Sequence, residues 1–283
     1  MNKRKYPVFA LGILRKCTIF NDLRHIIKPY HVNLMYADKI SLFRGKKSVN
    51  VGDYLSKVVF DYLLQYKGIS SYKRKHTVRI SFIGSVIQFL GAKTIVYGSG
   101  FLREDVVRQF AEKKVELDIR AVRGPLTKKS LEEIGYKVPN IFGDPAILLP
   151  LFYVPVDQII INQYIVIPHW TKIKYYQNYP CLSTLTNDWK FFIDTIVSSK
   201  LVISASLHGL ILAEVYGVPA IFLNDTENDD IYKYKDYYYS TGRLDFRIAN
   251  NIEEALQMEY SEIPSFDKMR QNFLKAFPID KIN

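Results

Sequence analysis

Short apolar runs alternate with segments of helical spacing along most of this chain. The clearest example lies in residues 200–223. There the apolar run Leu201–Ile203 leads through a small polar turn, Ser204–Ser206, into Leu207–Val215, and a second apolar run, Val218–Leu223, follows. Apolar residues of the middle segment recur three and four positions apart. The order therefore predicts a strand, a turn, a helix and a second strand of one parallel sheet.

The same alternation extends to both sides of this unit. Strands are predicted from apolar runs and helices from apolar residues on one face, with a short helix between the first two strands. The predicted strands are Val78–Ile83, Thr94–Tyr97, Leu117–Val122 and Tyr164–Ile167, and the predicted helices are Val51–Lys67, Pro125–Ile134, Asp188–Ser198, Ile252–Met258 and Phe266–Phe277. Alternating strands and helices indicate an α/β fold with parallel sheets.

The alternation of apolar runs and helical segments stops near Phe152–Asn162 and then begins again, so we expect a boundary near residue 155. This divides the chain into two Rossmann-like domains, residues 1–155 and 156–283, that face a cleft. The last helix is expected to pack back on the N-terminal domain. In open parallel sheets, ligands bind beyond the carboxyl ends of the strands.

Composition fits a folded protein of one large or two medium domains. The chain has 283 residues, of which 48% are hydrophobic and 24% charged, and its net charge is +11. Such a charge attracts anions, including phosphorylated substrates and anionic membrane surfaces. The basic residues are dispersed, without a long run or zinc-finger spacing, so nucleic acid is not an expected partner.

Two cysteines, Cys17 and Cys181, are too few for a disulfide framework, which fits a reducing, cytoplasmic location. The apolar run Tyr6–Leu14 is followed at once by basic residues and has no small-residue cleavage site, so it is interpreted as a buried element. No apolar run approaches the roughly 20 residues of a membrane span.

His208 is the first candidate for chemistry, because it falls in the first turn of the helix predicted after Ser204–Ser206. Free backbone amides and the positive end of the helix dipole make such a position an anion site, here formed by Ser206, Leu207 and Gly209. A titratable group beside an anion is a candidate acid or base. The alternative is a histidine with a structural hydrogen bond.

Two further segments could bind a ligand at the same edge. Asn50 and Asp53 open the first long helix, where they could contact substrate or cap the helix. Ser99 and Gly100 follow a predicted strand, where they could cradle a phosphate or turn the chain.

His169 ends a strand of the second half and could touch substrate beside its neighbour Trp170.

Arg123 and Asp144 lie at predicted turns. Arg120 and Arg123 should point to opposite faces of a strand, and Arg123 is favoured as a partner for carboxylate or phosphate, with a surface ion pair as the alternative. Asp144, in a Gly-Asp-Pro turn, is expected to cap the turn or to orient a neighbour. The five histidines are scattered and show no metal-ligand spacing, so no metal or cofactor is expected.

In order and spacing, several short motifs resemble the polysaccharide pyruvyl transferase family. The motifs are NVGDYLS at 50–56, FIGSVI at 82–87, VYGSGF at 96–101, VRGPLTKKS at 122–130, FGDPA at 142–146, VIPHW at 166–170, the long segment 204–223 and the aromatic segment 237–242. The resemblance covers roughly residues 45–245.

The resemblance implies a fold similar to two-domain GT-B glycosyltransferases and transfer of pyruvate from phosphoenolpyruvate onto two sugar hydroxyls, giving a cyclic ketal. It matches the family's histidine to His208 and its donor-binding arginine to Arg123. Some members have arginine where this chain has Ser206. His208 would then deliver or shuttle a proton, and Asp53 is the expected base or hydroxyl anchor.

Two alternatives stay open at this point: a sugar-nucleotide glycosyltransferase of the same architecture, and a carbohydrate-binding protein without catalysis. The resemblance also implies a saccharide acceptor, which in this family is often linked to lipid. Peripheral contact with the inner face of the cell membrane is therefore expected, and the positive net charge is compatible with it.

Overall fold

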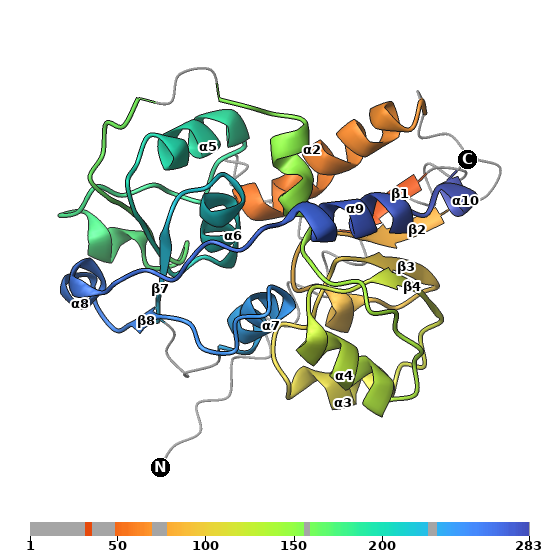
Figure 1. The fold of residues 1–283 in the computed structure, drawn as a ribbon. Coiled ribbons are helices and arrows are strands. Elements are labelled where there is room, and N and C mark those ends of the chain that lie inside the picture. Colours follow the sequence, from red (N-terminus) through yellow and green to blue (C-terminus); the bar gives the residue numbers. More distant parts are fainter. Residues whose placement is uncertain (1–31, 36–48, 70–77, 156–158, 226–230, 283) are drawn as a thin grey trace, which may run out of the picture.

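The computed structural model describes residues 32–35, 49–69, 78–155, 159–225 and 231–282, which form two parallel sheets with helices around them (Figure 1). The predicted element Tyr6–Leu14 and Cys17 lie outside the described residues.

Each sheet has four parallel strands in sequential order. The strands are β1 (Val32–Met35), β2 (Val78–Ser81), β3 (Thr94–Tyr97) and β4 (Leu117–Ala121) in the first sheet, and β5 (Ile165–Ile167), β6 (Val202–Ser204), β7 (Ala220–Leu223) and β8 (Ile248–Ala249) in the second. Strands β3, β5, β6 and β7 are buried along their whole length, as expected for parallel sheets covered on both faces.

Helices connect most of these strands. They are α2 (Val51–Tyr66), α3 (Val106–Ala111), α4 (Pro125–Glu133), α5 (Trp189–Val197), α6 (Leu207–Val215), α7 (Tyr232–Ser240), α8 (Ile252–Gln257), α9 (Asp267–Ala276) and α10 (Ile279–Ile282), with the 3-10 helices η1 (Ile87–Phe89), η2 (Pro145–Leu151) and η3 (Ile173–Tyr176). The described helices include none that is long and apolar enough to cross a bilayer.

The structure confirms the predicted α/β fold with parallel sheets. The predicted helix after Asn50 begins at Val51 because the Asn50 side chain accepts a hydrogen bond from the Gly52 amide. One hydrophobic cluster contains buried residues of both halves, including Leu55 of α2 and Leu210 of α6. An open cleft between two Rossmann-like domains remains a prediction.

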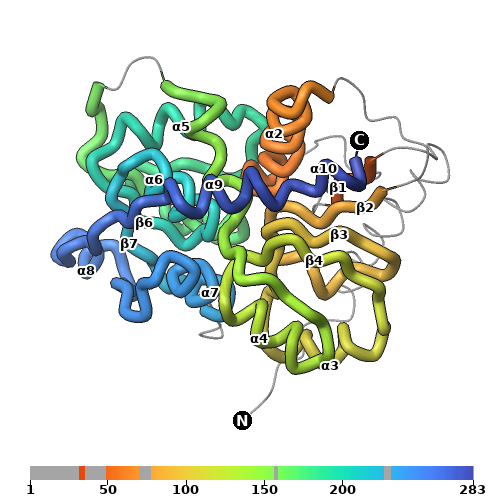
Figure 2. The backbone as a smooth tube through the Cα atoms, turned by 45° about the vertical axis from the view of Figure 1, so that its right-hand side comes forward, coloured from red at the N-terminus to blue at the C-terminus, as the bar shows by residue number. Residues whose placement is uncertain are grey.

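The last helices return to the first sheet (Figures 1 and 2). Phe273 of α9 lies against Tyr97 of β3, with ring centroids 5.0 Å apart, and its carbonyl accepts the Tyr97 hydroxyl hydrogen bond at 2.6 Å. Asp280 of α10 accepts hydrogen bonds from Arg120, which is therefore a surface ion-pair residue. The C-terminal segment thus packs against the N-terminal half.

Helix α7 links the two halves through the buried carboxylate of Asp236. Gly124, the N-cap residue of α4, has no side chain that could cap the helix. Instead, Oδ1 of Asp236 accepts hydrogen bonds from the amides of Leu126 and Thr127 at 2.9 and 3.0 Å, and its Oδ2 accepts one from Nε of Arg123 at 3.0 Å. Asp236 therefore caps α4 from a distant part of the chain.

Glycine is required at this junction because the backbones approach closely. A Cβ atom at Gly124 would lie 1.9 Å from the carbonyl oxygen of Asp236. Arg123 and Asp236 are both fully buried, so each charge depends on the other for compensation. We call this ion pair, with the α4 cap, the α4–α7 junction.

Removing the carboxylate of Asp236 should destabilise the protein strongly. Asp236→Ala leaves the Arg123 guanidinium buried without a counter-charge, and we expect a loss of about 3–5 kcal/mol in the free energy of unfolding. The control is Asp61→Ala, which removes an exposed partner of Lys57 and should cost about 0.5 kcal/mol. Urea unfolding midpoints measure both, and equal losses would contradict the assigned role of the junction.

Candidate active site

Three helix starts meet where the two halves join. His208 is the second residue of α6, Asp144 is the N-cap residue of η2, and Gly52 is the second residue of α2. Helix α6 and helix α2 both contact η2. The chain arrives at α6 directly from the carboxyl end of β6, so the site lies where parallel sheets place ligands.

His208 and Asp144 form a buried pair. Nε2 of His208 lies 3.5 Å from Oδ2 of Asp144, and the side chains are 12% and 0% exposed. Both atoms are buried, and neither has a hydrogen-bond partner among the residues that the structure describes. Because 3.5 Å is longer than a normal hydrogen bond, the contact becomes strongly attractive only when the imidazole is protonated.

The other carboxylate oxygen of Asp144 is already engaged. Oδ1 accepts a hydrogen bond from the Ala146 amide at 2.9 Å and caps η2. This bond fixes the carboxylate, so that Oδ2 can only face His208. Native proteins rarely leave buried polar groups unsatisfied, so two that face each other make this pair the candidate functional site.

The imidazole rests on the bare backbone of α2. A Cβ atom at Gly52 would lie 2.0 Å from Nδ1 of His208. The preceding turn is fixed, because the Val51 amide donates to the Thr184 carbonyl at 2.7 Å and the Asn50 side chain donates to the Thr184 hydroxyl at 3.3 Å. Asn50 thus caps α2 and fixes the position of the helix start on which the His208 ring packs.

The start of α6 has no side-chain cap. Ser206 is the N-cap residue, but its side chain makes no capping hydrogen bond. Helix geometry leaves the first amides of α6, from Leu207 to Gly209, without intrahelical partners. Gly209 permits the tight turn, because a Cβ atom there would lie 2.3 Å from Oγ of Ser204. Leu207 is 95% buried in the core, so only its amide could serve a ligand.

Asp53 lies in the same first turn as Gly52 and is half-buried. Its carboxylate faces Gly84, where a Cβ atom would lie 3.5 Å from Oδ1. The structure therefore brings three predicted segments together: the start of α6, the start of α2 with Asn50 and Asp53, and the turn at Asp144.

Other predicted ligand-binding residues have side chains that bond to groups within the protein. Arg123 has no exposed surface, and its nitrogens donate to Asp236, to Oγ of Ser85 at 2.6 Å and to the Phe101 carbonyl at 2.6 Å. A direct contact between Arg123 and a ligand would require these bonds to be exchanged. Gly100 gives the guanidinium its space, since a Cβ atom there would lie 2.5 Å from Cζ of Arg123.

Ser99 is also buried, and its hydroxyl bonds to the Ser81 hydroxyl at 2.5 Å and the Phe82 carbonyl at 2.6 Å. Its position at the end of β3 was predicted, but its hydroxyl joins strands in this conformation. His169 is partly exposed, and its Nδ1 contacts the Thr171 hydroxyl at 2.8 Å.

A second buried network holds the far end of α6. Glu214 receives two hydrogen bonds from Arg243, at 2.7 and 2.6 Å, and one from the Tyr237 hydroxyl at 2.5 Å. Burial raises the pKa of Tyr237 well above its ordinary value, and the Glu214 charge adds to the rise. Tyr237 therefore stays protonated and acts as a donor that ties α7 to α6.

Asp144 and Asp236 carry roles that sequence patterns hardly reveal. The Gly-Asp-Pro turn indicated a cap or an orienting residue at Asp144, but not which side chain it would face. Nothing in the pattern around Asp236 pointed to Arg123. In the part of the chain that the structure describes, no three His, Cys, Asp or Glu side chains gather as metal ligands.

A methyl group at Gly52 should displace the imidazole. Gly52→Ala places a Cβ atom inside contact distance of the ring, and we expect a loss of about 1–3 kcal/mol in stability from overpacking. Urea unfolding and the nitrogen NMR signals of the His208 ring measure the effect. Gly91→Ala is the matched control, because a Cβ atom there meets nothing within 4 Å. Unchanged ring signals in Gly52→Ala would contradict this packing.

Comparison with known proteins adds one family. The family model described as polysaccharide pyruvyl transferase matches residues 17–227. An uncharacterised protein of Acanthamoeba polyphaga mimivirus is 27% identical over 214 residues, which are 68% of this chain and 70% of that protein. A solved structure of a functionally uncharacterised Klebsiella pneumoniae protein aligns with a TM-score of 0.49 and 14% identity, over 78% of this chain and 92% of that one.

The family match covers well over half of the chain and includes Gly52, Asp144 and His208. This chain belongs to the polysaccharide pyruvyl transferase family.

Proposed function

We propose that this protein moves the pyruvate unit of phosphoenolpyruvate onto two hydroxyls of a sugar, forming a cyclic ketal and releasing phosphate. Its family supports a pyruvyl transfer role in polysaccharide synthesis. The observation that carries the finer proposal is the buried pair of His208 and Asp144 at the uncapped start of α6.

The donor binds at the start of α6. Phosphoenolpyruvate carries a phosphate and a carboxylate, and both groups favour amide donors at the positive end of a helix. Ser206, whose side chain makes no capping bond, offers a hydroxyl to the same anion. The net charge of +11 also favours the approach of an anionic donor.

His208 acts as the acid. Protonation of the donor's methylene carbon leaves an oxocarbenium-like centre that a hydroxyl can attack. The carboxylate of Asp144 lies opposite Nε2, where it orients the ring and stabilises its charged form for proton transfer to substrate. Phosphate binding favours the charged ring in the same way.

The protons balance over the whole reaction. Two hydroxyls of the acceptor each lose a proton as their oxygens bond to the pyruvyl carbon. One proton ends on the new methyl group, and the other leaves with phosphate. Asp53, in the first turn of α2 beside Gly52, is the proposed base or hydroxyl anchor for the acceptor.

Replacing the acid should abolish most turnover while the fold persists. We expect His208→Gln to lower kcat by about 10²–10⁴-fold, and Asp144→Asn to lower kcat with little change in the KM for the donor. The assay incubates the protein with phosphoenolpyruvate and a panel of sugar acceptors, and follows phosphate release together with the acceptor's gain of one ketal-linked pyruvate by mass spectrometry.

Asp267→Asn is the control, since Asp267 is 79% exposed on α9. It should leave kcat unchanged. Consumption of nucleotide sugars alone would replace the proposal with a glycosyltransferase. Acceptor binding without any turnover would indicate a carbohydrate-binding protein. Full activity in His208→Gln would remove His208 from the mechanism.

A further inference from the structure

A groove separate from the His208 pair lies between α4 and α7 and is bordered at one side by the start of α3. Its volume is about 1190 Å³. Small-molecule pockets usually measure about 300–1,000 Å³, so this groove has room for a ligand larger than phosphoenolpyruvate.

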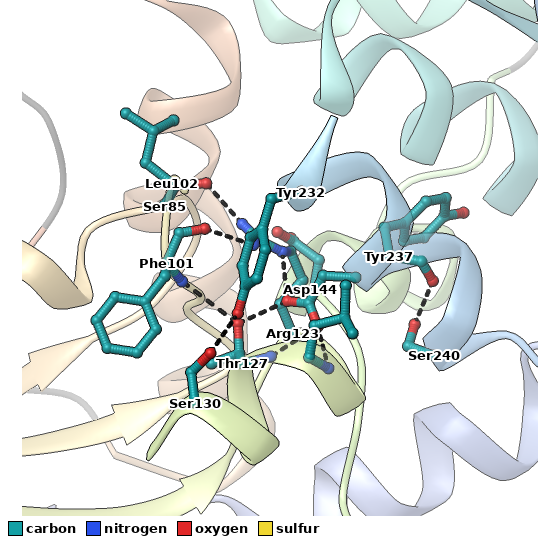
Figure 3. A network of polar contacts seen from close by, with 12 residues as sticks. Ser85, Phe101, Leu102, Arg123, Thr127, Ser130, Asp144, Tyr232, Tyr237 and Ser240 are labelled. Carbon is teal, nitrogen blue, oxygen red and sulfur yellow. Dashed lines mark hydrogen bonds and ion pairs between the residues drawn. The ribbon is translucent and has the colours of Figure 1, made fainter. Parts of the chain in front are cut away.

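Two helix faces form the walls. Leu126, Ser130 and Glu133 repeat at helical spacing along α4, and Tyr232 and Tyr239 do so along α7. The hydroxyls of Ser130 and Tyr232, which both line the groove, lie 2.9 Å apart and join the two walls (Figure 3). Each wall therefore combines apolar or aromatic surface with hydrogen-bonding groups.

The charges of the groove largely cancel. Among the described residues, three basic and three acidic side chains line it. Glu133 pairs with Lys129 of the same helix at 3.8 Å, and Asp105 pairs with Arg103 at 2.9 Å. A ligand held mainly by its charge, such as a nucleotide or an anionic lipid headgroup, would need a surplus of cations, which equal numbers of basic and acidic side chains do not provide.

We propose that this groove binds the glycan chain of the acceptor. Sugar rings present C–H faces that pack on tyrosine and hydroxyls that bond to charged and polar side chains, and the groove offers both kinds of surface. The assignment of this glycan as an acceptor rests on the proposed function, whereas glycan binding itself does not.

The groove also adjoins the α4–α7 junction. Leu126 lines the groove with its side chain, while its amide donates to Asp236. Helix α7 in turn reaches the start of α6, because the Tyr234 hydroxyl donates to the Ala205 carbonyl at 2.8 Å. A glycan that fills the groove therefore contacts the helix that supports the candidate active site.

Direct binding tests the proposal without any need for turnover. Purified protein is applied to an array of neutral and acidic oligosaccharides, and the best-bound oligosaccharide is then titrated by calorimetry beside its monosaccharide, UDP and phosphatidylglycerol vesicles. We expect the oligosaccharide to bind more tightly than the other three. Tyr239→Ala should weaken oligosaccharide binding about tenfold, and Lys235→Ala should weaken it less.

Tyr260→Ala is the matched control, because Tyr260 is 57% exposed and lies outside the groove. It should bind as the unchanged protein does. No bound glycan, equal glycan binding by Tyr239→Ala and the unchanged protein, or tightest binding of UDP or vesicles would each overturn the proposal.

The assay with phosphoenolpyruvate separates the two proposals. Groove-dependent glycan binding without ketal formation would support the groove and contradict the proposed function. Ketal formation with the same KM for oligosaccharides in Tyr239→Ala and the unchanged protein would contradict the groove alone.

Discussion

The buried ion pair between Arg123 and Asp236 holds the two halves of this protein in one arrangement. Neither charge has solvent to stabilise it, so each requires the other, and Gly124 lets the two backbones meet. From there α7 continues to α6: Tyr234 bonds to the carbonyl of Ala205, and Tyr237 bonds to Glu214. The position of His208 over Asp144 therefore depends on a contact made elsewhere, at the start of α4.

Much of the fold follows from the spacing of apolar residues. The continuous run at 94–97 and the period of Val51–Tyr66 each match a single kind of element, and both formed as predicted. Helix α7 was not predicted, because its sequence YKYKDYYYS has no apolar stripe of the usual kind. Its buried face consists of tyrosines and Asp236, whose burial depends on partners that lie far away in the chain.

The candidate site was predictable in part. The turn after a buried strand and the helix that follows place His208 near an anion site, and this is local information. Its partner is not local, since Asp144 lies 64 positions earlier and reaches the imidazole only through the packing of η2 on α6. For Ser99 and Arg123, the sequence predicts the position but not the contacts of the side chain. Both occupy the expected ends of strands, but a sequence does not say whether a polar side chain at such a place points outward or is satisfied within the protein.

The division of the paired groups between α6 and η2 has a consequence during synthesis. The carboxylate and the glycine that receive the imidazole are translated long before the imidazole, and α7, which supports the start of α6, is translated later still. The side chains of the candidate site are complete at His208, whereas the helix that supports the start of α6 is complete only at Ser240. The order of the sequence therefore completes the support of the candidate site only when residue 240 has been added.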